Sequence, residues 1–255
     1  MVKIQPKTLF VGKKLIYLPS CHSTNDIASE IIQKGKIING TVIVTAYQTK
    51  GKGQRGNLWE SEPNDNLLTS IIVDSSFLDL NKQFYLSIIS ALAIHSTLKK
   101  LNLGNIKIKW PNDIYINEKK VSGILIESTV NGNKLNFSTI GIGINVNQKI
   151  FSNKRATSIL NENLNCKLTI ATILENLCEN FENNYLELKN KNFEKINSEY
   201  LNNLLWINEE KSFKDKEGFF LGKIRGTLPN GQLIIWAKNK EKYYDIKEIE
   251  YLFND

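Results

Sequence analysis

The sequence predicts an α/β protein, in which a domain of helices and strands is followed by a small β module. Two observations predict this class. Amphipathic helical stretches alternate with short β-branched segments as far as about residue 205. Beyond Trp206, only an alternating apolar and polar pattern remains. We therefore expect residues 1–205 to form one domain and residues 206–255 a second, small β domain.

The first predicted helix begins at Ser23 and ends near Gly35. Ser23 or Thr24 is a natural N-cap for the amphipathic stretch that follows, and glycine is a natural stop. Residues 41–47 and 67–73 are β-branched and apolar, so each is expected to form a strand. A glycine-rich stretch lies between these two predicted strands.

The same two signals predict the other elements. Apolar residues at helical spacing predict helices at 80–101, at 170–188 and in a further pattern to about 205. Short apolar segments predict strands at 106–110, 114–116, 121–128 and 136–146. Asn131-Gly132 and Asn230-Gly231 are turn dipeptides typical of β-hairpins, so each predicted domain should contain a hairpin.

Composition and charge argue against several classes of protein. The chain has no run of about eighteen apolar residues, so no membrane-spanning helix is expected. The chain has three cysteines, an odd number, and no two of them have C-x-x-C spacing. With only two histidines beside them, this composition argues against both a disulfide framework and a zinc site. The N-terminus does not resemble a signal peptide, so we expect a cytoplasmic protein. The net charge is +7, but the lysines are spread along the chain, which favours a solvated basic surface over nucleic-acid binding.

Residues 49–61, TKGKGQRGNLWES, contain a G-x-G-x-x-G spacing. A dinucleotide site needs a helix directly after the last glycine, but Gly56 is followed by Pro63 and several Asn and Asp residues, which prevent one. The Lys and Ser or Thr of a Walker loop are missing, and the chain has no H-R-D or D-F-G motif of a kinase. Two alternatives stay open: a glycine loop that closely approaches a ligand, or a basic surface loop.

Residues 109–128, KWPNDIYINEKKVSGILIES, are the second informative stretch. Taken one by one, Trp110 fits a core residue, Pro111 a turn former and Asp113 a cap. That interpretation explains each residue separately, but it does not explain why they occur together.

Four motifs, in this order, resemble the biotin protein ligases: STN at 23–25, YQTKGKGQRG at 47–56, KWPND at 109–113 with KVSGIL at 120–125, and GIGIN at 141–145. The likeness is to the short form that lacks an N-terminal DNA-binding domain. It implies a catalytic domain with a mixed β-sheet and packed helices, and a C-terminal SH3-like β-barrel. It also implies that biotin and ATP, with Mg²⁺, form biotinyl-5'-AMP, and that a lysine of a biotin carboxyl carrier protein then receives the biotinyl group.

The resemblance assigns catalytic roles to four residues. Lys120 would stabilise negative charge in both steps, first on the biotin carboxylate and then on the acyl-phosphate. Asp113 would hold Mg²⁺ or orient the incoming lysine. Lys52 would lie near the phosphate, and Arg55 would supply a further positive charge there.

The resemblance also assigns binding roles. The ureido end of biotin would be hydrogen-bonded by Ser23, Thr24, Asn25 and Gln48. The loop that closes over biotin and the adenylate would consist of Gly51, Lys52, Gly53 and Gln54. Backbone approach to the apolar part of biotin would occur at Gly123 and Gly141, and the nucleotide would be bound by Trp59, Asn112 and Asn145.

The glycine loop departs from the family's pattern. The well-known members carry arginine where this chain has Gln54 and again where it has Asn57. Glutamine donates hydrogen bonds but carries no charge. We therefore expect this loop to retain the adenylate less firmly than an arginine loop would.

Three alternatives differ in substrate or in class. A lipoate ligase is similar in fold and chemistry, but STN, KWPND and KVSGIL favour biotin. A biotin-responsive repressor of this family needs a helix-turn-helix domain, and too few residues precede Tyr17 to build one, so no DNA partner is expected. A non-catalytic biotin-binding module stays open. Parts of the family form a homodimer through a sheet edge, and the sequence does not decide whether this chain does.

Overall fold

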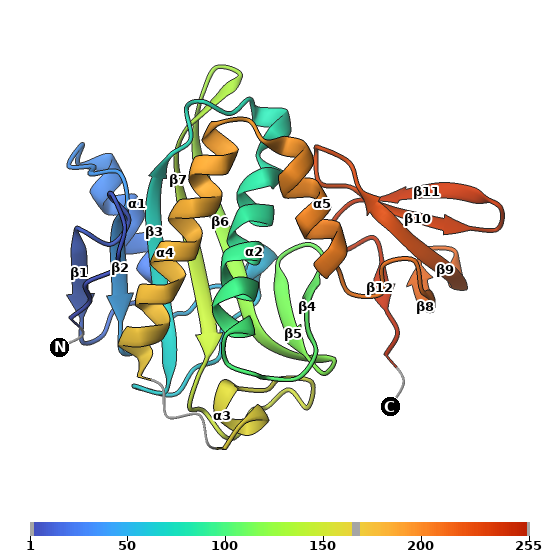
Figure 1. The fold of residues 1–255 in the computed structure, drawn as a ribbon, viewed down its shortest axis with the longest axis horizontal. Coiled ribbons are helices and arrows are strands. Elements are labelled where there is room, and N and C mark those ends of the chain that lie inside the picture. Colours follow the sequence, from blue (N-terminus) through green and yellow to red (C-terminus); the bar gives the residue numbers. More distant parts are fainter. Residues whose placement is uncertain (1–2, 165–168, 254–255) are drawn as a thin grey trace.

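The computed structural model describes residues 3–164 and 169–253, and within these ranges every side chain except that of Arg55. The described residues form a seven-stranded sheet with helices on both of its faces, and a separate five-stranded sheet near the C-terminus (Figure 1). This architecture confirms the predicted class, a mixed sheet with packed helices followed by a β module.

The larger sheet carries the site described below. In spatial order its strands are β1 (Leu15–Leu18), β2 (Thr41–Thr45), β3 (Asn66–Asp74), β7 (Lys134–Asn145), β6 (Lys119–Asn131), β5 (Asp113–Ile116) and β4 (Ile106–Lys109). β1 and β2 are parallel and the other neighbouring pairs are antiparallel, so the sheet is mixed. β3 is buried along almost its whole length because it lies near the centre of this sheet.

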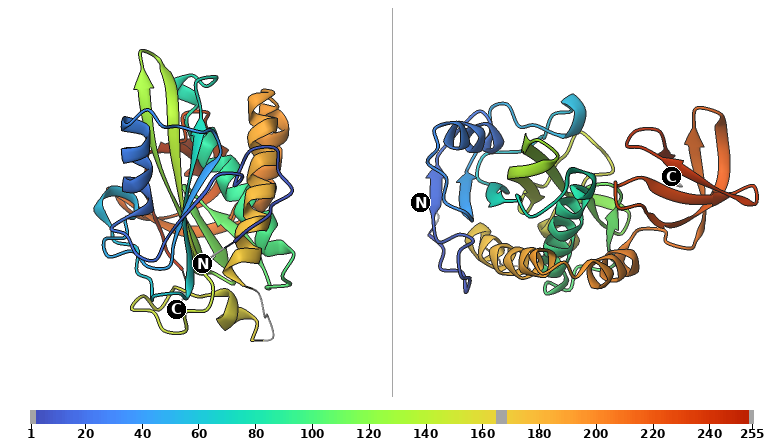
Figure 2. Two further views of the ribbon diagram at one scale, coloured as in Figure 1. Left: turned by 90° about the vertical axis from the view of Figure 1, so that its left-hand side faces the viewer. Right: turned by 90° about the horizontal axis from the view of Figure 1, so that it is seen from above.

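Helices cover the sheet on both sides. α2 (Phe84–Lys99), α4 (Ile170–Lys189) and α5 (Phe193–Asn203) lie on one face, and α1 (Thr24–Gln33) lies on the other (Figure 2). α2 is apolar around most of its circumference because α4 and α5 cover the side that does not face the sheet. α1 is amphipathic and packs against β3 and β7, which places its first turn beside the centre of the sheet.

The second sheet extends beyond α5 (Figure 1). In spatial order its strands are β11 (Lys240–Tyr244), β10 (Leu233–Ala237), β9 (Gly218–Thr227), β8 (Glu210–Asp215) and β12 (Glu250–Tyr251), and all pairs are antiparallel. Such a sheet is consistent with an SH3-like module. Trp110 is buried and donates from Nε1 to the carbonyl of Gly231 over 2.8 Å, so the KWPND motif also ties this module to the larger sheet. The domain boundary at residue 205 stays a prediction.

Among the described helices and strands before residue 205, β1 and α3 were not predicted from the sequence, and one helix begins later than predicted. In the second sheet, the alternating pattern predicted strands but gave no bounds for β8, β11 and β12. β1 has only four half-buried residues, too few for a clear alternation, and it depends on parallel pairing with β2. α3 (Ile159–Glu162) is a single turn capped by the Ser158 hydroxyl. The predicted helix at 80–101 begins at Phe84, because residues 80–82 form a separate 3₁₀ turn. Both predicted turns are confirmed, with a positive φ at Gly132 and at Gly231.

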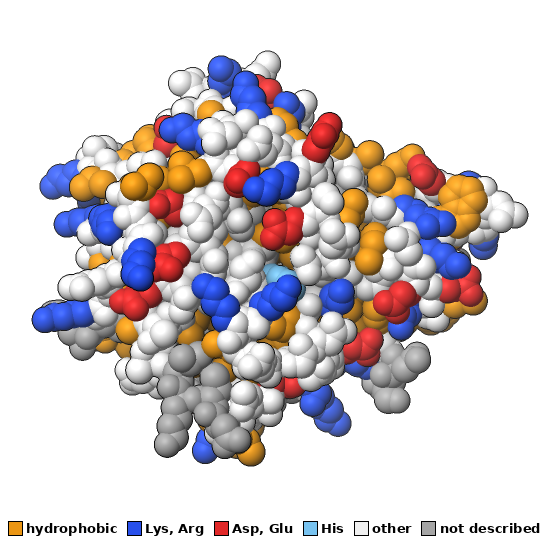
Figure 3. Space-filling view, viewed as in Figure 1, with side chains coloured by type: hydrophobic (Ala, Val, Ile, Leu, Met, Phe, Trp, Pro, Cys, Tyr) orange, Lys and Arg blue, Asp and Glu red, His pale blue; other side chains and the backbone are white. Residues whose placement is uncertain are grey.

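Charges of both signs are mixed over the face shown in Figure 3. Lysine and arginine side chains lie among acidic ones there and do not form a continuous basic stripe. This face therefore matches the solvated basic surface expected from the sequence. Within residues 3–164 and 169–253, no helix combines the length and apolar character that a membrane crossing requires.

His95 on α2 makes the stability of the fold sensitive to acid. Its side chain is buried, and burial, with the nearby Lys99, lowers its pKa from 6.5 to about 4. Between these two values, the unfolded chain binds a proton that the folded chain does not, so stability falls as the pH drops from 6.5 toward 4. We expect His95 to account for about 1 to 3 kcal/mol of this loss.

Urea denaturation of wild type and His95→Gln at several pH values between 7 and 4 measures this contribution. The variant should lose less free energy of unfolding than wild type over the interval. His22→Gln, which removes the other histidine from a half-buried position, is the matched control. Equal losses in wild type and His95→Gln would contradict the assignment to His95.

Candidate functional site

Most of the predicted site residues surround one cavity of about 480 Å³, between the start of α1, strands β6 and β7, and residues 48–59, which we call the glycine loop. The predicted residues that line it are Ser23, Thr24, Asn25, Gln48, Lys52, Gly53, Gln54, Trp59, Asn112, Asp113, Lys120, Gly123 and Gly141. The four sequence motifs, which are far apart along the chain, therefore meet at one place.

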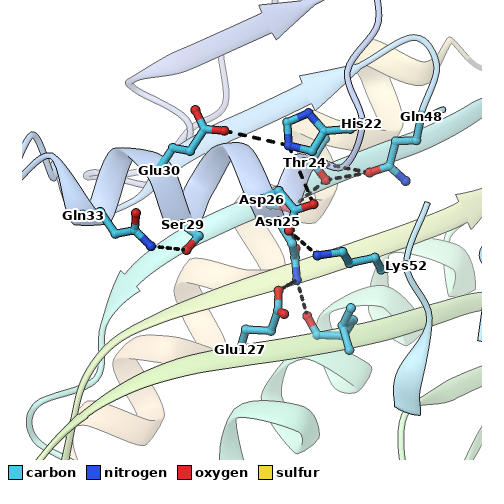
Figure 4. Close-up of polar contacts among 12 residues, drawn as sticks. His22, Thr24, Asn25, Asp26, Ser29, Glu30, Gln33, Gln48, Lys52 and Glu127 are labelled. Atoms are coloured by element: carbon cyan, nitrogen blue, oxygen red, sulfur yellow. Dashed lines mark hydrogen bonds and ion pairs between the residues drawn. The ribbon is translucent and has the colours of Figure 1, made fainter. Parts of the chain in front are cut away.

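Neutral polar side chains form one end of this cavity, where α1 begins. Figure 4 shows Thr24, Asn25 and Gln48 close together, beside the Lys52–Asp26 ion pair. The backbone N–H of Thr24 donates to Gln48 Oε1 over 2.8 Å. The hydroxyl of Ser70, on β3, lies 2.7 Å from Thr24 Oγ1 and 2.6 Å from Asn25 Oδ1. Ser23 is the N-cap residue of α1, as predicted, but its side chain makes no capping hydrogen bond and instead lines the cavity. We call this the neutral end.

Glycines on β6 and β7 form the floor of the cavity. A β-carbon at Gly141 would lie 2.3 Å from Asn25 Oδ1, and one at Gly143 would lie 2.5 Å from the Trp59 ring. At Gly123 it would lie 2.9 Å from the same ring. These distances are far below van der Waals contact, so Asn25 and Trp59 can occupy their positions only because all three floor positions lack side chains.

Lys120 and Asp113 form the opposite, ionic end. Lys120 Nζ lies 2.7 Å from Asp113 Oδ1, and both side chains are partly buried. The backbone of Lys120 donates to the carbonyl of Arg155 and accepts from the N–H of Thr157, which holds this residue between two segments. Its Nζ lies 5.6 Å from the Trp59 ring centroid, within range of a cation–π contact. The ammonium is thus held in position at the cavity wall, where an anionic ligand group could replace Asp113.

Apolar side chains lie between the two ends. They are Leu68 of β3 and Leu125 of β6. Ile124 and Ile142 also line the cavity, but they alternate along their strands with Gly123 and Gly141, so their side chains pack in the core on the other face of the sheet. The lining therefore changes along the cavity from mainly neutral hydrogen-bonding groups, through an apolar stretch, to the Lys120–Asp113 pair. Lys52 also lines the cavity, and its charge is paired with Asp26 beside the neutral end.

The glycine loop connects β2 to β3 and contains a 3₁₀ turn at Gln54–Gly56. No regular helix follows the last glycine, as expected for a loop that does not bind a dinucleotide. Lys52 forms an ion pair with Asp26 of α1, and this hydrogen bond raises the pKa of Lys52. Because Asp26 follows Asn25 in the first turn of α1, this ion pair places the Lys52 ammonium beside the neutral end. Its predicted contact with the phosphate stays a prediction.

Three predicted residues are not part of the cavity wall as described. Gly51 lies beside it, where a β-carbon would be 2.7 Å from the carbonyl oxygen of Trp59. Asn145 is buried and donates from Nδ2 to the carbonyl of Thr157 over 2.9 Å, so it supports the segment that pairs with Lys120. The side chain of Arg55 lies outside the described part of the chain.

Several residues near the cavity were not assigned a role from the sequence, and three of them shape its polar and glycine walls: Ser70, Gly143 and Glu127. The sequence did contain an indication for Ser70. Its hydroxyl lies inside the apolar run LLTSIIV, and a buried hydroxyl needs a polar partner. Gly143 repeats Gly141 at a spacing of two, which places both glycines on the same face of a strand. Glu127 had no signal, because it is one of many exposed acidic residues and only the fold brings it to Asn25.

Known proteins are similar to this chain in sequence over this region. The model of the biotin/lipoate A/B protein ligase family matches residues 17–145, which contain all four motifs. The bifunctional ligase/repressor BirA of Bacillus spizizenii is 30% identical over 248 residues, or 96% of this chain and 76% of that protein. The chloroplastic biotin–protein ligase 1 of Arabidopsis thaliana is 37% identical over 155 residues, or 59% of this chain and 40% of that protein.

Solved structures share the fold. The biotin protein ligase from Aquifex aeolicus, in complex with biotin and ATP, is similar with a TM-score of 0.76 and 28% sequence identity, over 93% of this chain and 98% of that one. Sequence and fold thus agree with the resemblance carried by the four motifs. The chain belongs to the biotin/lipoate A/B protein ligase family.

Proposed function

We propose that this protein is an ATP-dependent biotin–protein ligase, which activates biotin as biotinyl-5'-AMP and transfers it to a lysine of a biotin carboxyl carrier protein or domain. The observation that carries the proposal is the order of groups along the cavity: neutral groups such as Asn25 and Gln48, an apolar stretch, then Lys120. Biotin has the same order, with a cyclic urea, an apolar ring and chain, and a carboxylate. The Aquifex aeolicus relative, solved with biotin and ATP, supports the same assignment.

In the first step, a carboxylate oxygen of biotin would attack the α-phosphorus of ATP, and the bond to pyrophosphate would break. Two anions approach each other, so fixed positive charge is needed to offset their repulsion and the charge that develops. We assign this role to Lys120, whose ammonium can exchange Asp113 for ligand oxygens.

In the second step, the amine of the acceptor lysine would attack the acyl carbon, and AMP would leave. Lys120 would again offset the charge on the departing phosphate. Asp113, freed from Lys120, could accept a hydrogen bond from the incoming amine and orient it. The glycine loop, held against α1 by the Lys52–Asp26 ion pair, would help to exclude water from the acyl-phosphate.

Mg²⁺ is implied by the family, and Asp113 is the carboxylate that lines the cavity. The described residues contain no cluster of three His, Cys, Asp or Glu side chains that could hold a metal ion by itself. One carboxylate suits Mg²⁺, which commonly binds through one or two carboxylates together with substrate phosphates and water. Asp113 would therefore hold the ion, which when bound would neutralise phosphate charge.

The same family includes lipoate ligases, so lipoate is the alternative substrate. Its dithiolane ring has no N–H or carbonyl group. It would leave the buried Thr24 and Asn25, and the half-buried Gln48, without ligand partners at the neutral end, which is costly for the buried polar groups. The neutral end therefore favours biotin.

A transfer assay tests the proposal. The protein is mixed with ATP, Mg²⁺ and a biotin carboxyl carrier domain, together with either biotin or lipoate, and acceptor mass and pyrophosphate release are followed. We expect the mass of the acceptor to increase in the mixture that contains biotin and to stay unchanged in the mixture that contains lipoate. Transfer of lipoate instead would support the alternative, and biotin binding without transfer would indicate a non-catalytic biotin-binding module. The carrier partner, the absence of a DNA partner and a cytoplasmic location stay predictions, and whether the chain forms a sheet-edge homodimer stays open.

Gln54 lines the cavity and should limit how long the adenylate is retained. Replacing a neutral hydrogen-bond donor with a cation near a phosphate adds a charge-assisted hydrogen bond. We expect Gln54→Arg to slow the release of biotinyl-5'-AMP about tenfold, the change that corresponds to about 1.4 kcal/mol. Release is measured by chasing labelled adenylate with unlabelled biotin and ATP. Gln54→Met, of similar size and no charge, is the control, and an unchanged rate in Gln54→Arg would show that the charge has no such role.

A further inference from the structure

We propose that Glu127 is a positioning residue that sets ligand specificity. It fixes the orientation of the Asn25 side-chain amide, so that Asn25 Oδ1 is available to the ligand while Asn25 Nδ2 is occupied by protein acceptors. The neutral end then accepts a ring that offers N–H donors, such as a cyclic urea, and discriminates against a ring without them. This inference rests on the proposed function and names a residue that acts from outside the cavity.

Glu127 and the backbone together occupy the nitrogen of the Asn25 amide (Figure 4). Asn25 Nδ2 donates to Glu127 Oε2 over 2.7 Å and to the carbonyl oxygen of Leu125 over 3.3 Å. A side-chain amide has two N–H bonds, so this pair of acceptors uses both. The Nδ2 atom therefore has no proton left for a ligand.

Ser70 occupies only part of the Asn25 oxygen. Ser70 Oγ lies 2.6 Å from Asn25 Oδ1, which can only accept, so Ser70 can donate its single hydroxyl proton there. Ser70 Oγ can also donate to Thr24 Oγ1, 2.7 Å away, and the Thr24 hydroxyl donates to Gln48 Oε1 over 3.2 Å. The one proton of Ser70 occupies at most one lone pair of Asn25 Oδ1. An amide oxygen has two lone pairs, and this count leaves at least one for a ligand N–H.

The reverse orientation of the Asn25 amide is disfavoured by the same neighbours. It would place Oδ1 against the carboxylate of Glu127 and the carbonyl of Leu125, two acceptors with no proton between them. The Leu125 carbonyl belongs to the β6 backbone and is at the longer distance. The carboxylate of Glu127 is the closer and charged acceptor, so it contributes more to the orientation.

Glu127 cannot contact the ligand directly from its position. It is exposed, and the cavity wall beside it is made by Asn25, which is almost fully buried. Gly141 keeps this arrangement open, because a β-carbon there would collide with Asn25 Oδ1. Any effect of Glu127 on ligand choice must therefore pass through the Asn25 amide.

One other charged group faces Glu127 and suggests a different role. Lys52, paired with Asp26, lies close enough for a Coulombic interaction with Glu127. If Glu127 acted as a counter-charge that holds the glycine loop, its charge would matter. If it positions Asn25, its acceptor oxygen would matter. Glutamine keeps an acceptor oxygen and loses the charge, so Glu127→Gln separates the two roles.

Isothermal titration calorimetry with biotin, desthiobiotin and lipoate tests the inference. Biotin and desthiobiotin both contain the cyclic urea. We expect Glu127→Ala to weaken binding of both about 10- to 100-fold and to change lipoate binding less than about twofold, so that discrimination falls. Glu127→Gln should stay within about threefold of wild type for all three ligands. Glu30→Ala, which removes an exposed carboxylate on α1, is the matched control and should resemble wild type.

A second measurement does not depend on the proposed function. The side-chain NH₂ signals of Asn25 in a ¹⁵N–¹H spectrum, assigned with Asn25→Ala, should move strongly in Glu127→Ala and little in Glu127→Gln or Glu30→Ala. Unchanged Asn25 signals in Glu127→Ala, or equal defects in the Gln and Ala variants, would overturn the positioning role. A different outcome is that the wild-type protein binds neither biotin nor desthiobiotin, while the Asn25 signals still move as expected in Glu127→Ala. That outcome would overturn the proposed function but would leave the positioning role of Glu127 intact.

Discussion

Lys120→Ala is expected to lower the rate of biotinyl-5'-AMP formation about 1000-fold, close to the loss seen when one fixed stabiliser of developing charge is removed from an active site. The reason is that Lys120 is the lysine held at the ionic end, between the backbone of residues 155–157 and the Trp59 ring. Without it, Asp113 also becomes an unpaired negative charge beside the anionic reactants. ATP–pyrophosphate exchange in the presence of biotin measures the effect.

Lys119→Ala is the matched control for this prediction. Lys119 is the preceding residue on β6 and is exposed, so the substitution removes the same charge from the same strand without reaching the cavity. It should retain at least half of wild-type activity. A Lys120→Ala protein with more than a tenth of wild-type exchange, and a normal melting temperature, would show that Lys120 does not stabilise the reacting anions.

Gly141→Ala is expected to weaken biotin binding on the order of 100-fold while the protein remains folded, because two or more hydrogen bonds at the neutral end would be lost. The new β-carbon would lie 2.3 Å from Asn25 Oδ1 and 3.0 Å from its Cγ, so the Asn25 side chain must leave its contacts with Ser70 and Glu127. Gly141 does not have a positive φ, so alanine causes no backbone strain. Calorimetry with biotin and thermal melting separate the two effects.

A double-mutant cycle shows whether Gly141 acts through Asn25. Asn25→Ala removes the atoms that the new β-carbon would strike. In that background, Gly141→Ala should have little further effect on biotin affinity, so the two substitutions should be strongly non-additive. If the losses of biotin affinity were additive, Gly141 would instead be needed for direct contact with the ligand and not for making room for Asn25.

The two floor glycines on β7, Gly141 and Gly143, should differ in which side chain a substitution displaces. At Gly143, the collision is with the Trp59 ring at 2.5 Å, on the side of the cavity nearer Lys120. The spacing of two between Gly141 and Gly143 places both on one face of β7, which the sequence already indicated. Which side chain each glycine accommodates depends on α1 and the glycine loop, and that is a property of the folded chain.

Local signals in the sequence were enough for most elements and for the family. The turn dipeptides, the cap at Ser23, the stop at Gly35 and the alternation after Trp206 each depend on residues close together in the chain, so composition and spacing express them directly. β1 and α3 were missed because each is only four residues long, and β1 in addition depends on pairing with β2.

The sequence by itself determined the class of fold, the family, and the two motifs that supply the glycine loop and the Lys120–Asp113 pair. The tertiary structure alone decided how the neutral end is organised, because Asn25, Ser70 and Glu127 lie on α1, β3 and β6, separated by 45 and 102 positions from Asn25. They meet because β7 lies between β3 and β6 and its glycine lets α1 approach. The spacing of residues along the chain does not reveal the spatial order of the strands, so the role of Glu127 could be inferred only from the folded protein.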